Sequence, residues 1–177
     1  MLKYLNNSNL YIFAVVLLFI SCGQSADNKN NSKENSPAEK TETTVPGIEK
    51  LDFTDSILLK ANDNMRFDKE LFRIRARKKI SLIFKNTGAK SATSMTHNVV
   101  ILKSGVDIAD FADIAHNAKT EQYVPSSLDS LIIAHTRLLG GGDSDQVEFI
   151  IPKPGVYDFI CSFPGHWGTM QGKIVAQ

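Results

Sequence analysis

The sequence predicts an all-β domain in which two sheets pack as a sandwich and one helical segment interrupts the strands. Three observations support this fold class. Short segments with alternating or continuous apolar residues are separated by Gly, Asn and Pro, which is typical of strands and turns. A single segment has helical periodicity instead, and residues 51–177 have the length of one ordinary domain. The expected strands span 56–60, 71–77, 80–85, 98–102, 146–151, 156–162 and 172–175.

The strand expected at 71–77 has two chemically different faces. Phe72, Ile74 and Ala76 alternate with arginines, so the apolar side chains are expected to face the core. The outward stripe of Arg73, Arg75 and Arg77 is interpreted as a solvated face, and a docking surface for an acidic partner is the alternative.

The helical segment is expected over 107–118. Ile108, Phe111, Ala112 and Ala115 recur at helical spacing, and Asp107 stands where an N-cap residue is favoured. The segment lies in the long connection between two strands, so we expect a flap that packs on the sandwich. Gly-rich and Pro-Gly sequences at 140–142 and 153–155 predict tight turns before the last strands.

The first 21 residues are predicted to be a signal peptide. Lys3 precedes an apolar run over 10–20, which is too short to span a bilayer that needs about 20 helical residues. Ser21 and Cys22 then resemble the lipobox of bacterial lipoproteins, although Phe19 replaces the more usual leucine. This resemblance implies cleavage before Cys22 and acylation of that cysteine, and an ordinary secretory signal is the alternative.

Residues 22–50 are rich in Asn, Ser, Lys, Glu, Thr and Pro and have few apolar side chains, so we expect a flexible linker before a domain at 51–177. The whole chain has 20 Lys and Arg against 19 Asp and Glu, with a net charge of +1. This balance gives no electrostatic support for binding nucleic acid. Two cysteines exclude a disulfide-dense scaffold, and the length disfavours a multidomain enzyme.

Metal-ligating residue types are concentrated near the C-terminus. Cys161, His166 and Met170 lie within ten residues, on an expected loop between two strands, and His97 opens an earlier strand. Two imidazoles, a thiolate and a weak axial thioether are the donor set of blue copper sites. Taken singly, these residues would be interpreted as a core cysteine, a gap-filling methionine and hydrogen-bonded histidines. Their joint spacing favours a copper site, whereas His116 and His135 have no second strong donor nearby in sequence and are not expected to be ligands.

The loop Cys161-Ser-Phe-Pro-Gly-His166 with Met170 resembles the ligand loop of the azurin family of blue copper proteins. Segments 95–98, 133–140 and 61–67 also resemble azurin elements in the family's order, so the resemblance covers about residues 55–177. It implies a Greek-key cupredoxin β-sandwich with one helical flap.

The resemblance also implies roles for individual residues around one type 1 copper ion. His97, Cys161 and His166 would be equatorial ligands and Met170 the axial ligand, with the Thr96 carbonyl as a candidate fifth. Asn98 would join the ligand-bearing segments, and the backbone N–H groups of Asn98 and Phe163 would point at the cysteine sulfur. The port for electrons would be the edge of His166, and the residues framing it would be Met95, Phe163, Pro164, Gly165 and Trp167.

Three departures from the azurin pattern affect these expectations. Thr96 replaces a glycine, which leaves coordination by its carbonyl open. The structural disulfide is absent, because Cys22 lies in the lipobox-like segment and Cys161 is an expected ligand. Asn86 aligns with a histidine that responds to pH in several azurins, and an asparagine cannot titrate.

The expected function is that of a membrane-tethered electron carrier of the cell envelope, on the periplasmic or outer-surface side. It would be a monomer without enzymatic activity that exchanges single electrons with c-type cytochromes or with oxidase or reductase complexes. Copper storage or delivery is the alternative, and it is disfavoured because the chain has only four methionines and no exposed Met-rich or His-rich tract. An oxidase or nitrite reductase would need further copper sites.

Overall fold

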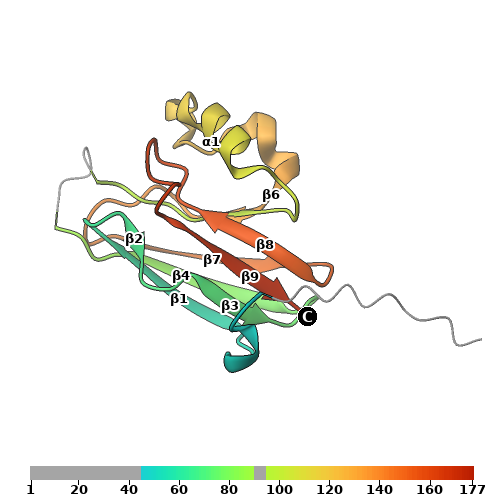
Figure 1. Cartoon of the computed structure of the whole chain (residues 1–177). Coiled ribbons are helices and arrows are strands. Elements are labelled where there is room, and N and C mark those ends of the chain that lie inside the picture. The colour runs from blue at the N-terminus through green and yellow to red at the C-terminus, as the bar shows by residue number, and fades with distance from the viewer. Residues whose placement is uncertain (1–44, 90–94) are drawn as a thin grey trace, which may run out of the picture. The chain divides into compact units, whose positions relative to one another are not determined.

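The computed structural model describes residues 45–89 and 95–177, and two β-sheets pack face to face within them (Figure 1). One sheet has the strand order β2(Arg66–Phe67), β1(Ser56–Asn62), β4(Lys79–Asn86) and β7(Ser144–Ile150). The other has the order β3(Leu71–Ile74), β9(Gln171–Ala176), β8(Gly155–Ile160), β5(Val100–Leu102) and β6(Ile132–His135). The helices are η1(Ile48–Lys50), α1(Ile108–His116), η2(Lys119–Glu121) and η3(Ser126–Leu131). The predicted sandwich with one helical flap is confirmed.

Alternation of side chains along the strands builds the core between the sheets. Residues of β1 are alternately exposed and buried, which places Ile57 and Leu59 inside. Phe67 and Phe159 lie with their ring centroids 5.5 Å apart, so the aromatic rings connect the two sheets. Cys161 and Met170 belong to the same buried cluster, at one end of the sandwich.

Several expected elements have different limits in the structure. The strand expected at 71–77 ends at Ile74, because the chain turns at Arg77 with a φ of 63°. The strand expected at 98–102 begins at Val100. Strand β2 lies within 61–67, the segment that resembles a strand region of azurin, although it was not among the strands expected from the apolar pattern. Strand β6 was not predicted; it is short and ends at His135, but it pairs with β5. Ile48 is buried within η1, inside the stretch expected to be linker. The predicted signal peptide and Cys22 lie outside the described residues.

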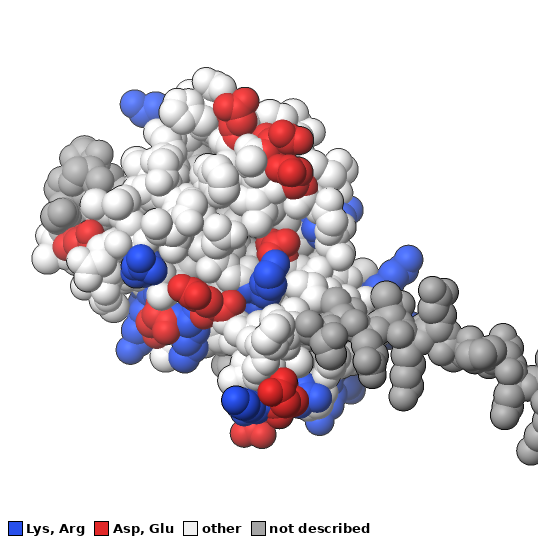
Figure 2. All heavy atoms as spheres, viewed as in Figure 1, with Lys and Arg blue, Asp and Glu red and all other residues white. Residues whose placement is uncertain are grey.

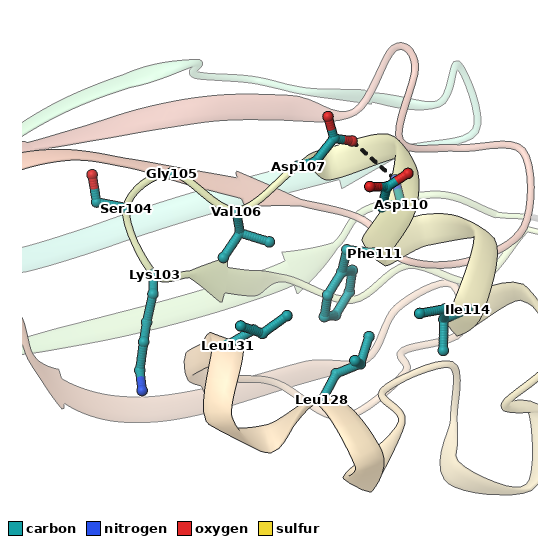
Figure 3. A pocket seen from close by; sticks show the side chains of 10 residues that line it. All are labelled: Lys103, Ser104, Gly105, Val106, Asp107, Asp110, Phe111, Ile114, Leu128 and Leu131. Carbon is teal, nitrogen blue, oxygen red and sulfur yellow. Dashed lines mark hydrogen bonds between the residues drawn. The ribbon is translucent and has the colours of Figure 1, made fainter. Parts of the chain in front are cut away.

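Helix α1 forms the predicted flap, and Asp107 is its N-cap. The Asp107 carboxylate accepts hydrogen bonds from the backbone N–H groups of Ala109 and Asp110, at 2.8 and 3.0 Å. Phe111 and Ala115 pack with buried residues of β5 and β8. Between α1 and η3 lies an apolar hollow of about 420 Å³, into which Phe111 and Leu128 point (Figure 3). None of its lining residues is an expected copper ligand.

No helix in the described part of the chain is long and apolar enough to cross a membrane. Figure 2 shows acidic side chains grouped over the α1 side of the domain, whereas most Lys and Arg side chains in this view lie away from α1, mixed with acidic ones. The exposed acidic residues on or beside α1 are Asp107, Asp110 and Asp113.

Candidate copper site

Strand pairing brings the distant ligand residues together. Cys161 directly follows β8 and Met170 directly precedes β9, and the Cys161 backbone N–H donates to the Met170 carbonyl at 2.9 Å. Val100 of β5 is paired with Ile160 of β8, which places the segment before β5 beside Cys161. His97 is held there by two backbone hydrogen bonds with Leu139, of 3.0 and 2.8 Å.

The donor atoms of His97, Cys161 and His166 converge. The two Nδ1 atoms lie 3.2 Å apart, and the Cys161 Sγ lies 3.7 Å from Nδ1 of His166 and 4.0 Å from Nδ1 of His97. For metal–nitrogen and metal–sulfur bonds of about 2.0 and 2.3 Å in a trigonal plane, the expected separations are about 3.5 Å between nitrogens and about 3.7 Å between nitrogen and sulfur. The triad therefore fits a single ion in a His₂Cys plane.

The other nitrogen of His97 fixes which tautomer faces the site. Its Nε2 lies 3.1 Å from the carbonyl oxygen of Asn62, which can only accept a hydrogen bond, so Nε2 carries the proton. Nδ1 is then left with a free lone pair directed at Cys161 and His166. This arrangement is typical of ligand histidines, whose second nitrogen is held by a protein acceptor.

Burial keeps both imidazoles neutral in the metal-free protein. Desolvation is the main cause that lowers the pKa of His97, partly offset by the hydrogen bond to Asn62 and by the charge of Asp63. Desolvation, followed by the neighbouring His97, lowers the pKa of His166 to about 4. Both histidines are therefore available as ligands at neutral pH.

The Cys161 thiol is protonated when no metal is bound. Burial raises its pKa to about 12, and the backbone N–H groups of Asn98 and Phe163 oppose this rise by hydrogen bonding to the sulfur. A buried thiolate thus needs a cation as its counter-charge, and these two N–H groups stabilise the anion once it forms.

Asn98 joins the two segments that carry the ligands. Its side-chain Nδ2 donates to the Ser162 hydroxyl at 2.9 Å, and its Oδ1 accepts the Ser162 backbone N–H at 2.9 Å. Ser162 in turn donates its hydroxyl to the Tyr123 carbonyl at 2.6 Å. The sequence analysis did not identify Ser162 or Tyr123, because their roles depend on contacts between segments far apart in the chain.

A short series of ring contacts joins Tyr123 to the ligand His166 through Phe163. The rings of Tyr123 and Phe163 have centroids 5.1 Å apart, and those of Phe163 and His166 are 4.7 Å apart. Tyr123 and the preceding Gln122 both have positive φ values, of 62° and 56°, which are unfavourable for residues other than Gly and Asn. The contacts with Ser162 and Phe163 hold Tyr123 in this conformation.

His166 is the ligand that reaches the surface. Its exposed fraction is 4%, whereas His97, Cys161 and Met170 have none. The Phe163 ring lies against it, Met95 and Pro164 are half-buried, and Gly165 is exposed. Trp167 is also half-buried, but it packs against the buried cluster under α1 and lines a hollow of about 410 Å³ beside Pro164.

The remaining residues named from the sequence lie outside the donor triad. Thr96 is buried, and its hydroxyl has no hydrogen-bond partner within the described residues. Buried Asn86 donates from Nδ2 to the carbonyls of Leu139 and Met95, at 3.1 and 3.3 Å. His116 and His135 are exposed and are not part of the group of metal-ligating side chains found in the described residues.

Comparison with known proteins identifies the family. Residues 54–177 match the model of copper binding proteins of the plastocyanin/azurin family. Azurin of Alcaligenes faecalis is 35% identical over 122 residues, covering 67% of this chain and 94% of that protein. Outer membrane protein H.8 of Neisseria gonorrhoeae is 36% identical over 119 residues, covering 66% of this chain and 64% of that protein.

Solved structures agree with the sequence relatives. The reduced auracyanin of Roseiflexus castenholzii has a TM-score of 0.65 and 32% identity, covering 71% of this chain and 99% of that one. An azurin from Methylomonas sp. strain J has a TM-score of 0.64 and 27% identity, covering 70% and 98%. With its type 1 copper site of His97, Cys161, His166 and Met170, the chain belongs to the plastocyanin/azurin family and is a blue copper electron-transfer protein, not an enzyme.

Proposed function

We propose that this protein is tethered to a membrane of the cell envelope through acylated Cys22 and exchanges electrons with redox proteins through the edge of His166. This assignment of the electron port rests on the exposed fractions of the four ligands, because only His166 reaches the surface. A bound copper ion would supply the Cu(I)/Cu(II) couple. Candidate partners are c-type cytochromes and oxidase or reductase complexes.

The burial of the ligands supports an electron carrier over a copper-delivery protein. A delivery protein needs ligands that a recipient can displace one after another, and three of these four side chains have no exposed surface. The donor atoms also lie close to the separations that a single bound ion requires. Ligands held at these separations by a buried site need little rearrangement when the metal changes charge, which favours rapid electron exchange.

The apolar rim supports brief docking of a partner. Phe163 lies against His166, and Phe163, Pro164 and the proposed rim residue Met95 are partly exposed. Weak redox complexes generally use small interfaces. The backbone N–H groups of Asn98 and Phe163 would tune the reduction potential by stabilising the thiolate. The Thr96 carbonyl stays a candidate axial group opposite Met170.

The port is tested by placing a charge on the rim. Met95→Lys is expected to slow electron self-exchange of the copper-loaded protein without moving the visible absorption band, because residue 95 lies beside the site and is not a ligand. Trp167→Lys tests whether the port extends toward α1. Ile150→Lys is the matched control, since Ile150 is 52% exposed on β7, away from the ligands. An unchanged rate in Met95→Lys would remove the port from this rim.

Membrane attachment and location are proposed from the N-terminal sequence and from a relative. The signal peptide is proposed over 1–21 and the linker over 22–50, and the similar protein H.8 is named an outer membrane protein. Cys22→Ser should release the protein from membranes and abolish incorporation of labelled fatty acid, while the blue absorption of the copper-loaded protein persists. Retention of the label would refute acylation at Cys22.

A further inference from the structure

A group of cations lies at the end of the sandwich opposite the copper ligands. Met170 precedes β9, whereas Arg75, Arg77, Lys78 and Lys79 follow β3, which runs parallel to β9. The length of a six-residue strand, about 20 Å, therefore separates these cations from the site. Lys153 lies at the same end, because Arg77 Nε donates to the neighbouring Pro152 carbonyl at 3.4 Å. These five residues are called the basic end.

Three residues of the basic end line a small hollow. A space of about 220 Å³ is lined by Thr54, Asp55, Arg75, Lys78, Lys79 and Ile80. Its lining includes three cations and one carboxylate, that of Asp55. Lys79 also pairs with Glu148 at 3.1 Å, but both side chains are more than half exposed, so this pair is weak and can be replaced by a stronger anion.

The three arginines of segment 71–77 have different roles in the structure. Arg73 is half-buried, and it donates to the Leu51 carbonyl at 3.2 Å and to the Gln177 side chain at 2.9 Å. Arg75 is exposed, and its guanidinium carbon lies 4.5 Å from the centre of the Phe53 ring. The ring positions the Arg75 cation at the surface without neutralising it, which preserves its charge for a ligand.

The backbone at Arg77 fixes the turn from which this side chain projects. Arg77 has a φ of 63°, a conformation that Gly or Asn adopts at lower cost than a long side chain. Its backbone N–H donates to the Ile151 carbonyl at 2.8 Å, so the turn is fixed and Arg77 is presented beside Lys78.

We propose that the basic end binds the phosphate groups of anionic phospholipids and so holds the domain with its copper end directed away from the membrane. This proposal depends on the proposed function in one respect. Anchoring at Cys22 would keep the domain close to the membrane and so raise the effective concentration of lipid headgroups around the basic end. One lipid anchor combined with a basic patch is a recognised route to stable membrane attachment. An acidic redox protein is the less favoured occupant, because the rate of electron tunnelling falls steeply with distance and the whole length of the sandwich would separate such a partner from the copper site.

The test measures lysine accessibility on vesicles. The full chain, with its N-terminus as the cell processes it and with copper bound, is reconstituted into vesicles of phosphatidylcholine alone or with phosphatidylglycerol. A water-soluble amine reagent then labels the lysines, and mass spectrometry measures each rate. We expect slower labelling of Lys78, Lys79 and Lys153 on anionic vesicles, reversed by high salt. Exposed Lys103 and Lys119 on the α1 side are internal controls and should be unchanged.

Variants that retain the reporting lysines sharpen this test. Arg75→Gln with Arg77→Asn should abolish the protection, and asparagine suits the positive φ at position 77. Arg66→Gln with Arg137→Gln removes the same charge elsewhere and should keep the protection. An unchanged blue absorption shows that each variant is folded.

Three results would overturn the proposal. The first is equal labelling of Lys78, Lys79 and Lys153 on neutral and anionic vesicles, and the second is protection of Lys103 and Lys119 instead. The third is protection that appears only when an acidic redox protein is added to the vesicles. Failure of the protein to float with neutral vesicles would refute the anchor separately, because that result does not depend on the basic end.

Discussion

Asn98 and Ser162 exchange two hydrogen bonds, each one residue beyond a copper ligand. The Asn98 amide donates to the Ser162 hydroxyl and accepts the Ser162 backbone N–H, both at 2.9 Å, and both residues are buried. The segment carrying His97 and the segment carrying Cys161 are therefore fixed relative to each other by side chains that do not touch the metal.

Removing this connection should destabilise the protein and loosen the site. Asn98→Ala leaves the buried N–H of Ser162 without its partner, which costs about 1–3 kcal/mol. We expect a lower midpoint in thermal unfolding of the metal-free protein and faster loss of copper to a chelator. Asn117→Ala is the control, because Asn117 is exposed at the end of α1 and should change stability by less than about 0.5 kcal/mol. Equal effects of the two variants would contradict the assignment.

Metal binding should release about one proton at neutral pH. The Cys161 thiol, with a pKa of about 12, is protonated without metal, whereas His166, with a pKa of about 4, is already neutral. Release should be close to one proton at neutral pH and rise in acid as His97 and His166 in the metal-free protein become protonated, because burial lowers the pKa of both imidazoles. Calorimetry of Zn²⁺ binding in buffers of different ionisation enthalpy measures this without oxidising the thiol. In Cys161→Ser the release should fall close to zero.

The reduction potential should show no step from residue 86. Asn86 is buried and uncharged, donating to two carbonyls while its Oδ1 accepts the Gly88 N–H at 3.0 Å. Voltammetry between about pH 5.5 and 9 should give a nearly level potential. Asn86→His should introduce a pH-dependent step, because a protonated imidazole would lie near the ligand segment and disfavour Cu(II). A step of this kind in the unaltered protein would disprove the prediction.

Gly172 should be required for packing between β3, β8 and β9. A Cβ at this position would lie 2.6 Å from the Glu70 carbonyl oxygen and overlap the Phe159 ring, which is buried in the core. Gly172→Ala should therefore lower the free energy of unfolding by about 1–3 kcal/mol or more. Gly168→Ala is the matched control, since a Cβ there meets no atom within 4 Å. Denaturant unfolding of both variants compares them directly.

Local patterns were sufficient for the elements that depend on neighbouring residues. The Asp107 cap and the apolar spacing after it predicted α1, because both act within a few residues of the chain. The spacing of Cys161, His166 and Met170 likewise predicted a ligand loop, since all three lie between the end of β8 and the start of β9. Strand β6 was missed because its four residues gain their structure from pairing with β5.

The sequence by itself determined the fold class, the helical flap and the set of copper ligands. Tertiary structure decided how His97 meets Cys161 across the pairing of β5 with β8, and which tautomer the Asn62 carbonyl selects. It also decided that Arg73 is held by the chain while Arg75 and Arg77 face solvent. The physical reason is the same in each case: strand pairing joins residues far apart in sequence, and hydrogen bonds between them cannot be inferred from local periodicity.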